Sequence, residues 1–134
     1  MMKVMLVDDD QISNLLNKKT LQRMGIINEV HTALNGEEAI TLLNDYFQGA
    51  LSMPDIILLD LNMPIMDGFT FIEAFNKLHI PNKENVRIII VTSSQNPNDM
   101  DRARSLGILH FLTKPITENN LRIALEGLMS ANGK

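Results

Sequence analysis

The sequence predicts an α/β fold in which helices cover both faces of a single parallel sheet. Five short apolar runs alternate with five segments whose apolar residues repeat at helical spacing. Runs that are apolar on both faces are typical of strands buried between two layers of helices. Because β-α-β crossovers are right-handed and the connections are short, we expect one doubly wound, five-stranded sheet flanked by five helices.

Length and composition fit one ordinary globular domain, and we expect residues 1–134 to form it. The chain has 134 residues, of which 45% are hydrophobic and 21% charged. The formal net charge of −4 disfavours direct binding to nucleic acid, and the absence of cysteine excludes disulfides and thiolate metal sites. No membrane-spanning run and no signal peptide are recognisable, so we expect a cytoplasmic protein without a membrane partner.

The five strands are predicted from their side-chain pattern. Residues 4–7, 56–59, 88–91 and 108–112 are short runs dominated by Ile, Val and Leu, as central strands require. Residues 28–34 are more polar, which suits an edge strand.

Two helices are predicted in the first half of the chain. The first follows Asp10 and ends at Gly25, a residue favoured just after helices. Its expected core-facing residues are Leu16, Thr20, Leu21 and Met24. The second begins after the turn at Asn35 and Gly36. Its apolar stripe is Ala39, Ile40, Leu43 and Phe47.

Three more helices are predicted in the second half. One follows Gly68, one covers residues 97–106 and ends at Gly107, and one has Thr117 as its N-cap with Glu118 in the first turn. The apolar stripe of the helix after Gly68 is Phe71, Ile72, Phe75 and Leu78. The apolar stripe of the last helix is Leu121, Ala124, Leu125 and Leu128. Residues 49–54 and 80–85 are expected to be surface loops.

Polar side chains follow the central strands. Asp8 and Asp9 come after the first strand, Asp60 after the third, Thr92 after the fourth and Lys114 after the fifth. Ligands of open parallel sheets bind outside the carboxyl ends of the strands, so these groups should form one site. Clustered carboxylates repel one another and need a cation, and oxygen ligands favour Mg²⁺. With a lysine and a hydroxyl nearby, the site suits a phosphoryl group, and a carboxylate is the nucleophile that remains.

Together these motifs resemble the receiver domain of two-component response regulators, of the chemotaxis-regulator type. The resemblance is carried by the segments VDDD at 7–10, LDLNMPIMDG at 59–68, VTS at 91–93 and TKP at 113–115. It implies a flavodoxin-like sheet with strand order 2-1-3-4-5.

The resemblance also implies roles for the site residues. Asp60 would be the phosphoacceptor and would ligate Mg²⁺ together with Asp9 and the backbone carbonyl of Asn62. Asp8 would contact the ion directly or through water. Lys114 would pair with Asp60 and then with the phosphoryl group.

A switch is implied as well. Thr92 would move to the phosphoryl group and allow Phe111 to turn inward. Many relatives carry Tyr at the position of Phe111, so any readout through a ring hydroxyl is absent here. The bond between Lys114 and Pro115 is expected to be cis, because the loop must return the lysine to the acids.

Neighbouring residues are expected to have structural roles. Asp10 is predicted to cap the first helix rather than to bind metal. Asp67 and Gly68 would form the turn into the third helix, and Pro64 would shape the loop before it.

The predicted function is phosphorylation-controlled signalling rather than metabolic catalysis. A histidine kinase or a histidine phosphotransfer protein would phosphorylate Asp60, and slow self-dephosphorylation would reset it. We expect no output domain, so output would pass through an unknown partner protein or an onward relay. The donor would dock on Ile12 and Leu15 with Lys19 at their edge, unless these aliphatic residues pack under the fifth helix.

Four alternatives stay open from the sequence. A haloacid-dehalogenase-like phosphatase needs a second acid where Asn62 stands, and a flavodoxin-like electron carrier needs a phosphate loop where the acids stand. A degenerate receiver that only binds partners, and a receiver cut from a longer regulator or hybrid kinase, are the others.

Overall fold

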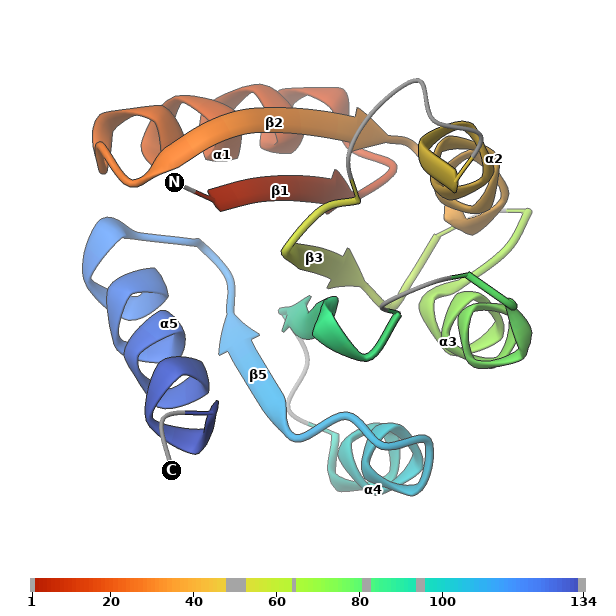
Figure 1. Ribbon diagram of the computed structural model, residues 1–134. Helices are drawn as coiled ribbons and strands as arrows, with labels where there is room; N and C mark the ends of the chain where they lie inside the picture. The colour runs from red at the N-terminus through yellow and green to blue at the C-terminus, as the bar shows by residue number, and fades with distance from the viewer. Residues whose placement is uncertain (1, 48–52, 64, 81–82, 94–95, 133–134) are drawn as a thin grey trace.

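The computed structural model describes residues 2–47, 53–63, 65–80, 83–93 and 96–132 (Figure 1). Strands and helices alternate along the chain, as predicted. The elements are β1 (Met2–Val7), α1 (Gln11–Arg23), β2 (Ile27–Ala33), α2 (Gly36–Phe47), β3 (Ile56–Asp60), α3 (Gly68–Lys77), the 3₁₀ helix η1 (Lys83–Asn85), β4 (Arg87–Thr92), α4 (Pro97–Ser105), β5 (His110–Thr113) and α5 (Glu118–Asn132).

The described residues form a five-stranded sheet of order β2-β1-β3-β4-β5, in which the neighbouring strands are parallel. This confirms the order that the resemblance implied and the edge position of β2. The first and third strands lie side by side at the centre, with Val7 in register with Leu59. Asp8 and Asp60 therefore emerge beside each other at the carboxyl edge.

Helices cover both faces of the sheet, and each face has its own core. Figure 1 shows α1 and α5 on one side and α2, α3 and α4 on the other. Along β1, Val4 and Leu6 point into the α1/α5 core, while Met5 and Val7 point into the other core. This period of two, with apolar residues on both faces, is the pattern of a strand buried between two helical layers.

The predicted start of the last strand was two residues early. Gly107 has a φ of 95°, and the backbone N–H groups of Gly107 and Ile108 donate to the carbonyls of Arg104 and Ala103. This pair of bonds is a Schellman motif, which closes the C-terminus of α4. Residues 108–109 therefore belong to the turn that follows α4, and β5 begins at His110.

The prediction that Leu16 faces the core was wrong, because 57% of Leu16 is exposed. Asn14, Thr20 and Leu21 are the buried residues of α1. The amide of Asn14 donates to the Asp8 backbone carbonyl, which fixes the rotation of the helix. Leu16 follows Asn14 by two positions, a turn of about 200°, and so it points away from the sheet.

Parts of several predictions lie outside the described residues. These are positions 49–52 and 81–82 of the two loops, the side chain of Phe47, and Pro64. In the described part of the second loop, Lys83–Asn85 forms η1. Among the described helices, none combines the length and the apolar character that crossing a membrane requires.

Candidate functional site

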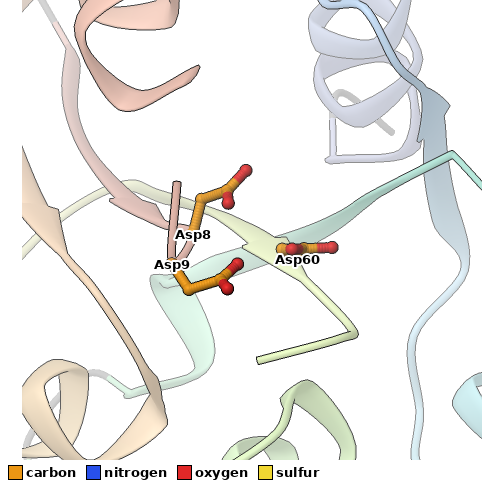
Figure 2. A group of neighbouring side chains, drawn as sticks. All are labelled: Asp8, Asp9 and Asp60. Carbon is orange, nitrogen blue, oxygen red and sulfur yellow. The ribbon is translucent and has the colours of Figure 1, made fainter. Parts of the chain in front are cut away.

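Three carboxylates meet at the carboxyl edge of the sheet. One oxygen each from Asp8, Asp9 and Asp60 lie within 4.8 Å of one another. Figure 2 shows them converging from the ends of β1 and β3; we call them the acidic cluster. Asp8 and Asp60 are 6% and 7% exposed, whereas Asp9 is open to solvent.

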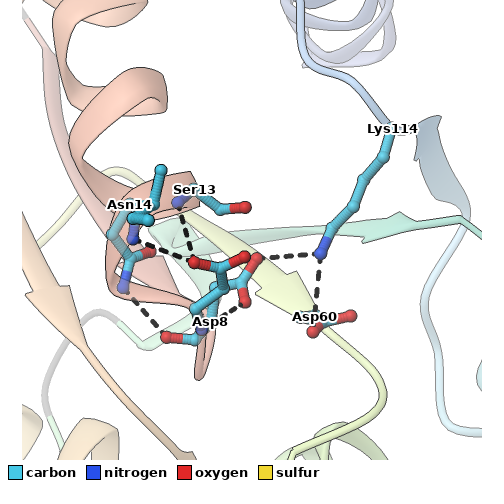
Figure 3. A network of polar contacts seen from close by, with 7 residues as sticks. Asp8, Ser13, Asn14, Asp60 and Lys114 are labelled. Carbon is cyan, nitrogen blue, oxygen red and sulfur yellow. Dashed lines mark hydrogen bonds and ion pairs between the residues drawn. The ribbon is translucent and has the colours of Figure 1, made fainter.

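Lys114 reaches this cluster from the loop after β5. Its Nζ lies 2.9 Å from Asp8 Oδ2 and 3.6 Å from Asp60 Oδ2 (Figure 3). The backbone N–H of Lys114 donates to the carbonyl of Thr92, which ties the loop to the end of β4. The bond between Lys114 and Pro115 is cis, which confirms the prediction. The lysine thus shares the pocket with two buried acids.

Burial and neighbouring charges shift the pKa values of Asp60 and Lys114 in this pocket. Burial raises the pKa of Asp60, and the negative charges of Asp8 and Asp9 add to that effect, while Lys114 opposes it. Burial alone would favour the neutral amine of Lys114. The hydrogen bond to Asp8 and the charges of Asp60 and Asp8 outweigh burial and raise the pKa of Lys114. The lysine is therefore a permanent cation at neutral pH.

The turn between β1 and α1 holds Asp8 in place. The Asp10 backbone N–H donates to Asp8 Oδ1 at 2.9 Å, and the Asn14 amide donates to the Asp8 carbonyl at 2.9 Å. Asp10 itself accepts from the N–H groups of Ile12 and Ser13, which confirms its prediction as a helix cap. The backbone hydrogen bonds from Ser13 and Ile12 lower the pKa of Asp10.

Asn14 was not predicted as a site residue. The signal was nevertheless available, since Asn14 stands seven positions before Leu21 and so falls on the same side of α1. A buried amide on an otherwise apolar face needs a polar partner, and the site is the nearest source of one.

The loop between β3 and α3 fixes the other side of the site. Asp67 caps α3 by accepting from the Thr70 N–H at 2.9 Å, as the turn prediction required. Gly68 approaches so closely that a Cβ there would lie 2.7 Å from the Asp60 carbonyl oxygen, so no larger residue fits. The side chain of Asn62 is exposed, and its backbone N–H bonds to the Asp60 side chain.

The two expected switch residues lie on neighbouring strands. Thr92 is 6% exposed at the end of β4, in register with Thr113. Phe111 is partly buried against the core under α2, α3 and α4, and the guanidinium carbon of Arg104 lies 5.5 Å from its ring centre. The ring therefore packs between the core and an α4 side chain.

The acidic cluster suits a hard divalent cation. Three carboxylates face one ammonium, which leaves two formal negative charges to be neutralised. Carboxylate oxygens are ligands that Mg²⁺ accepts, and this ion takes one or two carboxylates while keeping several waters. The donor set of the acidic cluster therefore fits a hard divalent cation such as Mg²⁺.

Comparison with known proteins identifies the family. The family model described as the response regulator receiver domain matches residues 4–126. This chain belongs to the response regulator receiver family. The match decides against a haloacid-dehalogenase-like phosphatase and a flavodoxin-like electron carrier, and receiver domains of this signalling family are not classical enzymes.

Individual receivers agree with this assignment. A probable chemotaxis protein CheY of Rhizobium etli is 30% identical over 129 residues, covering 96% of this chain and 93% of that protein. A two-component response regulator of Cytophaga hutchinsonii has 29% identity and a TM-score of 0.84, covering 96% of both chains. CheY4 of Vibrio cholerae has 30% identity and a TM-score of 0.77, covering 96% of this chain and 98% of the other.

Other relatives are much longer than this receiver domain. The chain spans 3% of the hybrid signal transduction histidine kinase G of Dictyostelium discoideum and 50% of a probable C4-dicarboxylate response regulator DctR of Halalkalibacterium halodurans. It spans 15% of the sensor histidine kinase CheAY of Helicobacter pylori, at 29% identity. Receiver domains of this kind therefore occur in chains with further parts.

Proposed function

We propose that this receiver domain accepts a phosphoryl group on Asp60 in a reaction that requires Mg²⁺. The observation that carries the proposal is the position of Asp60, buried between Asp8, Asp9 and Lys114 at the carboxyl edge of the sheet. Asp8 is already hydrogen-bonded to Lys114 and Asp10, and Asp9 is exposed, so Asp60 is the carboxylate best placed to act as nucleophile.

The transfer follows from these residues. A carboxylate oxygen of Asp60 attacks the phosphorus of a phosphohistidine, the phosphorus–nitrogen bond breaks, and an aspartyl phosphate forms. Lys114 Nζ supplies a positive charge beside the new phosphoryl oxygens, and the Thr92 hydroxyl is the donor expected to bond one of them. Asp9, Asp60 and the Asn62 backbone carbonyl would hold Mg²⁺, with Asp8 directly or through water. The ion would neutralise charge on the phosphoryl group.

Self-dephosphorylation uses the same groups. Water attacks the phosphorus, the bond to the Asp60 oxygen breaks, and inorganic phosphate leaves. We expect this step to be slow, as the resemblance to receiver domains implies. The domain would then return to the acceptor state without being a metabolic enzyme.

The phosphodonor is proposed to be a histidine kinase or a histidine phosphotransfer protein. Ile12, Leu15 and Leu16 are 69%, 53% and 57% exposed on α1; we call them the apolar patch of α1. This exposure argues against packing under α5. Leu16 also lines a groove of about 430 Å³ that continues to Lys114 and Pro115. A helical donor seated on the patch would therefore reach the loop that carries Lys114.

The remaining proposals concern the context of the domain. The net charge of −4 disfavours direct contact with nucleic acid, so output would pass to a partner protein or along a relay. A single receiver domain over residues 1–134 and a cytoplasmic location remain predictions.

Labelling with a small donor tests the core of the proposal. The protein is incubated with phosphoramidate and Mg²⁺, and the phosphoryl group is mapped by peptide mass spectrometry. We expect base-labile phosphate on Asp60, lost in Asp60→Asn and in excess chelator. Phosphate on Asp8, Asp9 or a serine would contradict the assignment, and no phosphate at all would favour the degenerate, partner-binding receiver.

A further inference from the structure

Asn14 is a buried polar side chain that the proposed reaction leaves without a role. Only 4% of it is exposed, and its amide nitrogen donates to the Asp8 backbone carbonyl at 2.9 Å. In Figure 3, Asn14 and Lys114 approach Asp8 from opposite sides. The bond also fixes the orientation of the amide, because exchanging its nitrogen and oxygen would place two acceptors against each other.

The other end of this amide has no partner. Asn14 Oδ1 is buried and accepts no hydrogen bond from the described residues. Buried acceptors without a donor are rare and costly, so such an atom marks a place where a donor binds. Asn14 also lines a cavity of about 10 Å³, whose other polar lining residues are Asn17, Asp8 and Asp60 and whose remaining walls are apolar. That volume matches about one water molecule, which needs two or more polar partners.

We propose that Asn14 is a positioning residue of the phosphoacceptor site. Its amide nitrogen holds the Asp8 main chain, and its carbonyl oxygen holds one ordered water in the cavity beneath the acids. The water donates one hydrogen to Asn14 Oδ1 and the other to a carboxylate that lines the cavity, Asp8 or Asp60. The role in metal binding and phosphorylation rests on the proposed function of Asp60.

The contacts of Asp8 explain why such a residue matters. Its Oδ1 accepts from the Asp10 N–H, its Oδ2 accepts from Lys114, and its main-chain carbonyl accepts from Asn14. The next residue in the chain is Asp9, so a shift of this turn also moves Asp9 relative to Asp60. Loss of the Asn14 bond would therefore disturb the spacing on which a shared cation depends. Losing a residue that orients metal ligands commonly lowers metal affinity by about 10-fold or more.

A pair of substitutions on one helix tests the proposal. Asn14→Leu keeps a similar volume and removes both hydrogen bonds. Thr20→Val is the matched control, since Thr20 is also buried on α1, and its hydroxyl bonds to the Leu16 carbonyl and the Arg23 side chain of the same helix within the described part of the chain. Thermal unfolding in chelator first establishes that both variants fold. Calorimetry then measures Mg²⁺ affinity, and the labelling rate with phosphoramidate is measured at limiting and at saturating Mg²⁺.

We expect Asn14→Leu to lose about 10-fold or more in Mg²⁺ affinity while Thr20→Val keeps the wild-type value. Saturating Mg²⁺ should recover part of the labelling rate of Asn14→Leu. A high-resolution crystal structure of the wild type should show a water bonded to Asn14 Oδ1.

Three results would separately contradict the ordered water, the positioning role of Asn14 and the proposed function of Asp60. A dry cavity would eliminate the water. Wild-type Mg²⁺ affinity in Asn14→Leu would eliminate the positioning role, even where Asp60 labelling upholds the proposed function. A wild-type protein that neither binds Mg²⁺ nor labels Asp60 would overturn the proposed function and the positioning role together.

Discussion

Lys114 makes its shorter contact with Asp8 rather than with Asp60, at 2.9 Å against 3.6 Å (Figure 3). The family resemblance implies an ion pair between Lys114 and Asp60, and the structure contains that pair, with Asp8 as a second and nearer partner. The ammonium is hydrogen-bonded to Asp8, and Asp60 lies farther away, at ion-pair distance. Asp60 is therefore a buried acid with incomplete compensation, which agrees with its raised pKa.

Asp60→Asn should stabilise the metal-free protein near neutral pH. The pKa of Asp60 is raised by folding, so its contribution is most favourable below the unfolded-state pKa and is lost as the pH rises through the folded-state value. Circular dichroism in chelator should give a higher Tm for Asp60→Asn at pH 7, with the difference shrinking toward pH 4.

The control is Asp45→Asn, which changes an exposed acid on α2. It should leave the pH dependence of Tm as in the wild type. An equal Tm for Asp60→Asn and wild type at pH 7 would mean that burial and the neighbouring acids do not destabilise the ionised Asp60 side chain in the folded protein.

Two adjacent acids should differ in their effect on Mg²⁺. Asp9 belongs to the acidic cluster, whereas Asp10 caps α1, so Asp9→Asn should weaken Mg²⁺ binding and Asp10→Asn should not. Asparagine is also a good N-cap, so the control keeps the helix intact. The increase in Tm on adding Mg²⁺ reports how strongly each of the two variants binds the ion. Loss of that increase in Asp10→Asn alone would reverse the two assignments.

Lys114→Ala should uncouple phosphorylation of Asp60 from binding of the downstream partner. The substitution removes the cation beside Asp8 and Asp60, so labelling by phosphoramidate should be slower and residual. Binding of the phosphorylated form to its downstream partner should be lost. Lys77→Ala, at an exposed position on α3, provides the control and should match the wild type. Wild-type partner binding by labelled Lys114→Ala would show that the lysine does not transmit the signal.

Arg104 should restrain the Phe111 switch. Its guanidinium lies 5.5 Å from the ring centre, and turning the ring inward would break this contact. An exposed cation–π contact is worth about 0.5–1 kcal/mol, so Arg104→Ala should raise affinity for the phosphoryl mimic beryllofluoride about two- to fivefold.

Arg102→Ala is the matched control for this effect. Arg102 lies on the same helix but covers Phe69, at 4.2 Å, and pairs with Glu73. Its removal should change Tm without changing beryllofluoride affinity. A Phe111 side chain that keeps one rotamer in the free and beryllofluoride-bound proteins would contradict the switch itself.

Leu15→Asp should slow phosphotransfer from a protein donor while sparing phosphoramidate. Leu15 is 53% exposed in the apolar patch of α1, so a charge there would oppose docking without disturbing the core. Leu109→Asp is the control, because Leu109 is 72% exposed and directly precedes β5, so it lies at the amino end of that strand, away from the carboxyl edge that holds the site. Equal loss with both donors would indicate damage to the fold, and equal retention would place docking elsewhere.

Much of the fold could be predicted because its signals are local. Val4 and Val7 belong to a strand whose apolar side chains mark burial on both faces, and Asp10 and Thr117 are caps that bond within their own first turn. The carboxyl-edge position of Asp8 and Asp60 follows once both strands are known to be parallel neighbours. The identities of the strands and helices therefore follow from the amino-acid pattern, although the start of β5 depends on how α4 ends.

The tertiary structure decided what depends on distances between remote segments. Whether Lys114 is nearer to Asp8 or to Asp60 depends on how three loops, far apart in the chain, are packed at one edge. The outward rotation of Leu16 goes together with the bond from Asn14 to the Asp8 carbonyl, and the sequence places Asn14 beside Leu21 but does not name this partner. Periodicity records which side of a helix is apolar, but a single buried hydrogen bond can outweigh one leucine in choosing which side faces the sheet.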